Sequence, residues 1–321
     1  MFSTTIFSYV VMNNPASTGA VSYIYCMFVF LIAIKAYDIL GGRLLGTLQI
    51  ASILLLIALY VKMFIYHGPI LQYMRNPVDD HPEGFPVFTS LNLEATWITL
   101  SLALFIRKQY FLLIWIAVVL LDLIYSSRVS LVLALMIFGL KLLSQGKVAK
   151  RLMLLAILLP LIVASVAITN PHIYLSFLTA TEKGGLVSRF VMWKAAPEAI
   201  LEWDIVTGYG AQNAIYALDR ASSAEFSEGN VHNLFLQMLL DGGVIGFILY
   251  LCLFVYIVRC QFRCGFKNEA GNYLIAYLVG SLVQFQGVEA QMWLVLGLYS
   301  SMLHARISEA PPNMYGASVN V

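Results

Sequence analysis

A cluster of polar residues stands at the start of a long apolar segment, in Glu228 to Phe247, EGNVHNLFLQMLLDGGVIGF. His232 and Asn233 open the segment, and Gln237 follows one turn further on. Histidine is the side chain best matched to proton transfer near neutral pH, so His232 is a candidate general base. Asn233 and Gln237 could hold substrate hydroxyl groups or orient the imidazole. The simpler interpretation is an interfacial histidine followed by a helix-capping asparagine.

Two arginines are candidates for binding an anion. Arg128 stands in YSSRVSLVL, where two apolar segments meet, and Arg189 lies four residues before Trp193. The planar guanidinium group fits phosphate oxygens in a bidentate way. Each arginine taken alone could instead contact phospholipid headgroups. We predict that both arginines and a histidine lie on the same side of the membrane, which favours a shared anion site.

Three carboxylates lie in apolar segments. Asp241 is predicted either to pair with an arginine or to end a half-helix, and the glycines after it indicate close helix packing or a break. Glu94 and Asp122 are predicted to pair within the bundle, Asp122 with Arg128. The motif TGYGAQN at residues 207–213 lacks the third glycine and the preceding strand of a phosphate-binding loop, so it is interpreted as a turn.

The composition is that of a polytopic membrane protein. The chain has 321 residues, of which 60% are hydrophobic and 11% charged, and its mean hydropathy is +0.81. A net charge of +2 gives no reason to expect nucleic acid, and the four cysteines do not form a metal-binding or disulfide pattern. We predict an all-α bundle, with transmembrane helices over residues 19–35, 46–66, 89–106, 110–126, 128–143, 152–169, 233–257, 271–288 and 291–305, and a further one if residues 2–13 insert.

Basic residues predict the orientation, because they gather in cytoplasmic loops. Most of them fall in one set of loops, namely Lys35, Arg43, Arg107, Lys108, Lys141, Lys147, Lys150, Arg151, Arg259, Arg263, Lys267 and Arg306. Segments 67–88 and 170–232 are therefore predicted to face outward. Within the second, Gly185 to Trp203 is predicted to form an amphipathic surface helix kinked by Pro197. Residues 1–308 are predicted to form one domain, and residues 309–321 a disordered cytoplasmic tail.

Several motifs together resemble the O-antigen ligase and polymerase family of bacterial surface-polysaccharide enzymes. They are Ser127–Arg128 opening a helix, SRFVMW at 188–193, TGYG at 207–210, HNLFLQMLLDGGVIGF at 232–247 and, more weakly, FTSLNLEA at 88–95. Asp241 departs from the family pattern, because this position is more often glutamate. The chain is also shorter than many members.

The resemblance implies a GT-C-like glycosyltransferase of the bacterial inner membrane that acts at the periplasmic face on glycans carried by undecaprenyl diphosphate. It implies no nucleotide sugar, metal or other cofactor. Arg128 and Arg189 would hold the lipid diphosphate, and His232 would act near the acceptor hydroxyl or the phosphate. These three are the expected catalytic residues, with Trp193, Asn233 and Gln237 as substrate-binding residues.

The expected partners are an undecaprenyl-diphosphate-linked oligosaccharide and the lipid bilayer, with a chain-length regulator and a flippase of the same pathway. The short chain and small loops favour a polymerase, whose acceptor is another lipid-linked repeat unit. A ligase that transfers the polymer to lipid A-core is the alternative. A flippase of lipid-linked sugars would also need a polar cavity, but its transport path would need polar residues through the whole bilayer depth.

Overall fold

The computed structural model is all-α over the residues that it describes, which confirms the predicted fold class. These residues are 18–66, 91–125, 127–145, 186–202, 205–222, 231–282, 284–285, 287 and 289–309. The helices are α2 (Thr18–Leu40), α3 (Arg43–Ile65), α5 (Leu91–Ser101), the 3₁₀ helix η1 (Leu102–Phe105), α6 (Phe111–Ile124), α7 (Arg128–Ser144), α10 (Leu186–Glu202), α11 (Ala214–Ser222), α12 (Leu234–Arg263), α13 (Glu269–Gly280) and α14 (Ala290–Glu309).

Most predicted helices are found close to their expected bounds, because long apolar runs without proline determine them. Three described helices are long and apolar enough to cross a membrane, namely Val21–Leu40, Arg43–Ile65 and Leu234–Arg263. The prediction of a span over 271–288 is wrong in extent, because α13 ends at Gly280. The predicted spans 2–13 and 152–169, the segment 67–88 and residues 310–321 of the predicted tail lie outside the described residues.

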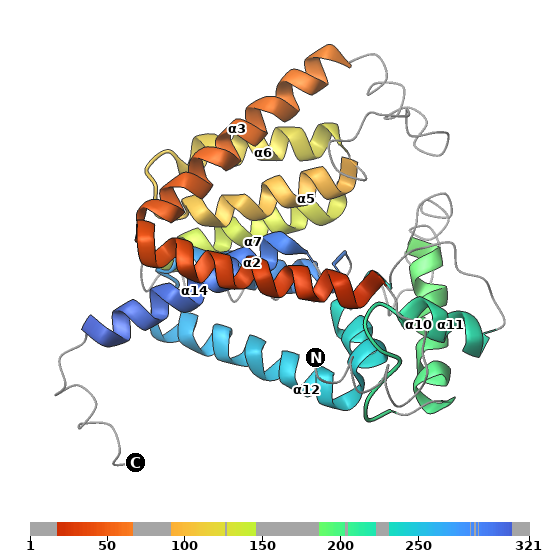
Figure 1. The fold of residues 1–321 in the computed structure, drawn as a ribbon. Helices are drawn as coiled ribbons and strands as arrows, with labels where there is room; N and C mark the ends of the chain where they lie inside the picture. Colours follow the sequence, from red (N-terminus) through yellow and green to blue (C-terminus); the bar gives the residue numbers. More distant parts are fainter. Residues whose placement is uncertain are drawn as a thin grey trace.

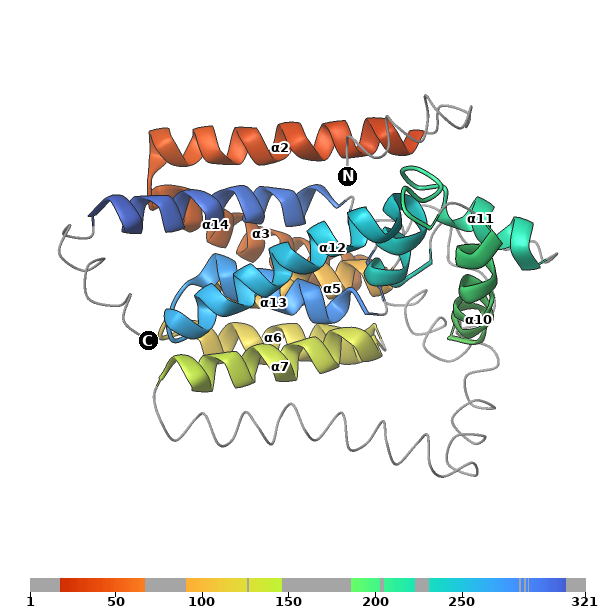
Figure 2. The ribbon, with the colours of Figure 1, turned by 90° about the horizontal axis from the view of Figure 1, so that it is seen from below.

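Most helices of the bundle lie roughly side by side, with α3 inclined to them, and α10 and α11 lie at one end (Figure 1). Figure 2 shows the same arrangement from a perpendicular direction, with α10 and α11 beside the N-terminal end of α12. Helix α7 also begins at this end, which we call the site end. Helix α10 confirms the predicted helix between Gly185 and Trp203, and it contains Pro197.

Close backbone contact joins α2 to α14. A Cβ atom added to Gly297 of α14 would lie 2.6 Å from the carbonyl oxygen of Phe30 and 2.8 Å from Cβ of Ala33. Small residues at such contacts allow membrane helices to approach closely, so that van der Waals packing holds them together. Gly297 therefore determines how near α14 lies to the N-terminal helix.

Polar side chains within the bundle pair with one another, as expected of ionisable groups in apolar surroundings. Lys62 forms a buried ion pair with Glu94. The predicted pairing of Asp122 with Arg128 is wrong, because the Asp122 carboxylate accepts hydrogen bonds of 3.1 and 2.8 Å from Thr99 Oγ1. The hydroxyl of Thr99 lies on the neighbouring α5, whereas Arg128 begins α7 and its side chain is exposed.

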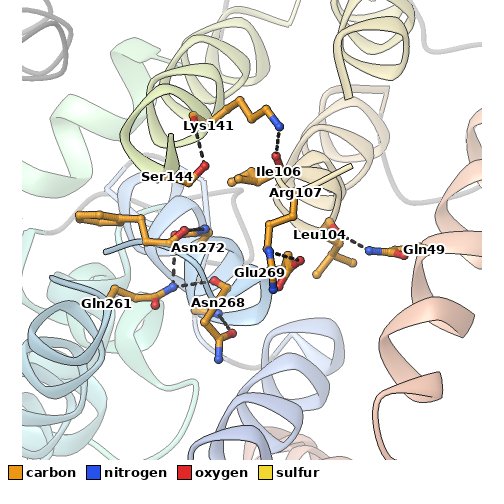
Figure 3. Close-up of polar contacts among 12 residues, drawn as sticks. Gln49, Leu104, Ile106, Arg107, Lys141, Ser144, Gln261, Asn268, Glu269 and Asn272 are labelled. Atoms are coloured by element: carbon orange, nitrogen blue, oxygen red, sulfur yellow. Dashed lines mark hydrogen bonds and ion pairs between the residues drawn. The ribbon is translucent and has the colours of Figure 1, made fainter. Parts of the chain in front are cut away.

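A second group of polar contacts joins α3, α7 and the turn between α12 and α13 to the segment around η1 (Figure 3). Carbonyl groups in and just after η1 accept hydrogen bonds there: Gln49 donates to Leu104 O at 2.5 Å, and Lys141 donates to Ile106 O. Gln261 donates to Asn268 O at 2.7 Å and so closes the turn between α12 and α13. These contacts satisfy buried backbone groups, which is the ordinary role of such side chains.

We predict that Gly297→Ala lowers the free energy of unfolding by about 1–3 kcal/mol, because the added methyl group overlaps Phe30 and Ala33. The measurement is the midpoint of thermal unfolding in detergent. Gly46→Ala is the matched control, since no atom lies within 4 Å of the added Cβ atom in α3. Equal unfolding midpoints for the two variants would contradict close α2–α14 packing.

Candidate functional site

His232 stands immediately before α12 in an unusual backbone conformation. Its φ angle is +54°, in the left-handed region that side chains other than glycine rarely adopt. The side chain is half-buried, and its Nδ1 atom is buried. Asn233 follows as the N-cap of α12, its side-chain oxygen accepting a hydrogen bond of 3.1 Å from Leu236 N. The structure thus confirms the capping interpretation of Asn233.

Val231, the residue before His232, is held by hydrogen bonds on both sides of its backbone. Trp193 Nε1 of α10 donates to Val231 O at 2.9 Å. Val231 N donates to Gln237 Oε1 of α12 at 3.2 Å. The Val231 side chain is fully buried. The loop that presents His232 is therefore tied to two helices at once.

The acid of the polar cluster binds backbone amides. Asp241 is buried, and its carboxylate accepts hydrogen bonds from Gln212 N at 2.8 Å and Ala214 N at 2.9 Å. It also accepts from Gln237 Nε2 at 2.8 Å. Ala214 begins α11, so a carboxylate from α12 occupies the N-terminus of that helix, where negative charge is favourable. The predicted alternative in which Asp241 pairs with an arginine is wrong.

Helix α12 is broken two residues after Asp241. Gly243 has φ 60° and ψ −165°, which is not helical and is accessible to glycine almost alone. The segment 205–210 pairs with the break: Tyr209 N donates to Leu240 O at 2.8 Å, and Val244 N donates to Ile205 O at 2.8 Å. The break was one of the predicted alternatives, and the TGYG motif is a turn as predicted. Its docking on α12 was not predicted.

A small separate core lies beneath these contacts. It consists of Met192, Ala195, Ala196, Ala199, Tyr209, Ala214, Ala217, Leu218, Val231 and Leu240. Four of these residues form one face of α10, and three belong to α11. Because most of them are alanines, α10 and α11 pack closely. Tyr209 OH adds a hydrogen bond of 3.0 Å to Ala199 O, so the turn and the two helices form one unit with the start of α12.

Of the two predicted site residues on α10, Trp193 contacts the loop that carries His232. Arg189 lies one helical turn before Trp193 and is half-buried. Because Trp193 is hydrogen bonded to Val231, the same helix carries Arg189 and supports His232. Among the described residues, no group of three or more His, Cys, Asp or Glu side chains could hold a metal ion.

Arg128 reaches the site end by a different element. It is the first residue of α7, as predicted, and its side chain is exposed. A hydrogen bond of 2.7 Å between Ser127 Oγ and Ser130 Oγ spans the first turn of α7. Helix α13 connects α7 to the His232 loop, because Gly280 packs on Leu133 and Ser281 O accepts from Leu234 N at 2.8 Å.

The fold and this site define a membrane protein of all-α type with cationic and imidazole groups at one end of its bundle. Residues 109–251 match the family model described as O-antigen ligase, and this segment contains Arg128, Arg189 and His232. This match supports the resemblance to the O-antigen ligase and polymerase family that the motifs predicted. This family indicates a glycosyltransferase-like enzyme. No curated protein and no solved structure matches the chain.

We predict that Gly208→Ala detaches the segment 205–210 from the break in α12. Gly208 has φ +70°, and an added Cβ atom would lie 2.6 Å from Leu240 O. The measurement is hydrogen–deuterium exchange of the amides of Tyr209 and Val244, which we expect to accelerate by about tenfold or more as local opening becomes easier.

Gly265→Ala is the matched control for this prediction. Gly265 has nearly the same φ angle, +61°, but no atom lies within 4 Å of its added Cβ atom. Both substitutions therefore introduce the same backbone strain, of about 1–2 kcal/mol, and only Gly208→Ala adds a steric clash. The same exchange rates in both variants would show that the docked segment does not depend on close backbone approach.

Proposed function

We propose that this protein is a surface-polysaccharide polymerase that transfers a glycan from undecaprenyl diphosphate to a sugar hydroxyl of a lipid-linked repeat unit. The observation that supports the proposal is that Arg128, Arg189 and His232, all within the segment that matches the family model, belong to three different elements at the site end. We take this end to face the periplasm, because most basic loops belong to the other end.

The proposed reaction is a substitution at the anomeric carbon of the donor glycan. The acceptor hydroxyl oxygen forms the new bond to this carbon, while the bond from the carbon to the diphosphate oxygen breaks. The two guanidinium groups stabilise the negative charge that develops on the departing diphosphate. His232 takes the proton that the acceptor hydroxyl loses, so that no metal or nucleotide is needed.

The acceptor decides between the two activities of the family. We take it to be a second lipid-linked repeat unit, because the described outer elements, α10 and α11, form a small cluster. With lipid A-core as acceptor, the same chemistry would make the protein an O-antigen ligase. Both acceptors present a sugar hydroxyl, so the roles of Arg128, Arg189 and His232 are the same in either case.

We predict that Arg189→Ala and His232→Ala each abolish long-chain glycan in a deletion strain that expresses the variant. Loss of a fixed cation or of a general base lowers such rates by about 100-fold or more. Glycan length on a gel and protein abundance in the membrane fraction are measured together, so that a loss of chains can be separated from a loss of protein.

Arg220→Ala and His304→Ala are the matched controls. Arg220 is an exposed residue in the last turn of α11, and His304 is an exposed residue of α14. Both controls should retain the chain lengths of the unmodified protein. Normal chain lengths in His232→Ala, in protein of normal abundance, would refute the proposed role of the histidine.

We predict that a deletion strain accumulates core oligosaccharide bearing a single repeat unit, since a lost polymerase leaves ligation intact. Analysis of the lipid A-core and lipid-carrier fractions by mass spectrometry tests this. Polymer retained on the lipid carrier would indicate a lost ligase and would overturn the polymerase assignment. Single units held on the cytoplasmic side would indicate a flippase.

A further inference from the structure

We propose that Trp193, Gln237 and Asp241 are positioning residues, which fix His232 through the backbone of Val231 and set its place relative to Arg189. This inference rests on the proposed role of His232 as a proton acceptor. Among the predicted site residues, Trp193 and Gln237 were expected to contact substrate. Trp193 Nε1 and Gln237 Oε1 are hydrogen bonded to Val231, in the loop that carries the histidine.

The conformation of His232 requires support from its neighbours. A left-handed φ angle of +54° is unfavourable for a histidine, and such angles persist only where the surroundings determine them. The peptide group before His232 includes Val231 O, which accepts from Trp193. On the other side, Asn233 caps α12, and Leu234 N donates to Ser281 O at 2.8 Å. Contacts on both sides thus fix the backbone angles of His232.

Asp241 determines how the amide of Gln237 is oriented. The donors Gln212 N, Ala214 N and Gln237 Nε2 surround the carboxylate, which therefore acts as an acceptor for all three. Gln237 must point its NH₂ group toward Asp241 and is left with its oxygen facing Val231 N, at 3.2 Å. The Asp241 carboxylate thus influences the position of His232 through the side-chain amide of Gln237 and the backbone of Val231.

Trp193 sets the distance between the base and the anion ligand. Its indole N–H is used by Val231 O, while its helix carries Arg189 one turn earlier. A shift of α10 would therefore move the Arg189 guanidinium and the His232 imidazole relative to each other. The diphosphate and the acceptor hydroxyl must be held at a fixed separation for the substitution to occur, so this hydrogen bond acts on catalysis rather than on binding alone.

The test replaces Trp193 by phenylalanine, which removes the indole N–H and keeps an aromatic ring. Trp115→Phe is the matched control, because Trp115 Nε1 also donates to a backbone carbonyl, Ala134 O, at 2.9 Å. Activity is assayed in detergent with undecaprenyl-diphosphate-linked repeat units extracted from the deletion strain. We expect Trp193→Phe to lower kcat by about 10- to 100-fold with little change in KM, and Trp115→Phe to leave both constants near their original values.

A second variant pair guards against loss of fold. Gln237→Glu places two carboxylates together and should lower kcat strongly. Asp241→Asn in the same chain restores a donor beside Glu at position 237, whose other oxygen still accepts from Val231 N. The asparagine keeps only one oxygen for Gln212 N and Ala214 N, so the recovery is partial. We expect the double variant to recover part of the lost kcat, whereas two independent structural defects would add together. Additive losses would overturn the positioning role.

The outcomes distinguish failure of the inference from failure of the proposed function. If His232→Ala turns over normally, the proposed function is wrong and the positioning role falls with it. If His232→Ala is inactive while Trp193→Phe keeps the kcat of Trp115→Phe, only the positioning role is wrong. Faster amide exchange at Val231 and His232 in Trp193→Phe, together with a lowered kcat and equal thermal stability in the two tryptophan variants, would support it.

Discussion

The break of α12 at Gly243 is the constraint on which the site depends. A continuous helix would bond the carbonyl groups of Leu240 and Asp241 to its own amides, and the 205–210 segment would lose these acceptors. Because Gly243 leaves the helical conformation, these carbonyls accept from Tyr209 N and Gly210 N. Unsatisfied backbone groups are costly in apolar surroundings, so the break strongly favours docking of the 205–210 segment.

This docking explains why a buried aspartate follows the apolar start of α12. The segment 205–210 leads directly to α11, whose first amides would be left without partners close to the bundle. Asp241 supplies the acceptor for them, and the same carboxylate orients Gln237. One acid thus joins the outer helices to the loop before α12. Asp241 is buried because it accepts hydrogen bonds from the first amides of α11. By orienting Gln237, it also affects the loop that carries His232.

The sequence predicted the parts of the site whose signals are local. Long apolar runs predict the helices, Ser127–Arg128 predicts a helix start, and the Gly242–Gly243 pair indicates a break. The partners of Asp241 were not predictable, because backbone amides leave no trace in the residue types. Val231 was missed for the same reason, since its peptide group rather than its side chain is used. The sequence shows the glycines of TGYG and of α12, but it does not predict that Gly208 and Gly243 contact each other.

The two candidate anion-binding arginines, Arg128 and Arg189, are connected to His232 through different helices. Arg189 is connected through α10, where the hydrogen bond of Trp193 to Val231 O is supported by a small alanine-rich core. Arg128 is connected through α7 and α13, where Leu133 packs on Gly280 and Ser281 O binds Leu234 N. The first path depends on the break in α12 and the second does not. Mutations at the break should therefore disturb the position of Arg189 relative to His232 while the Arg128 side of the site keeps its place.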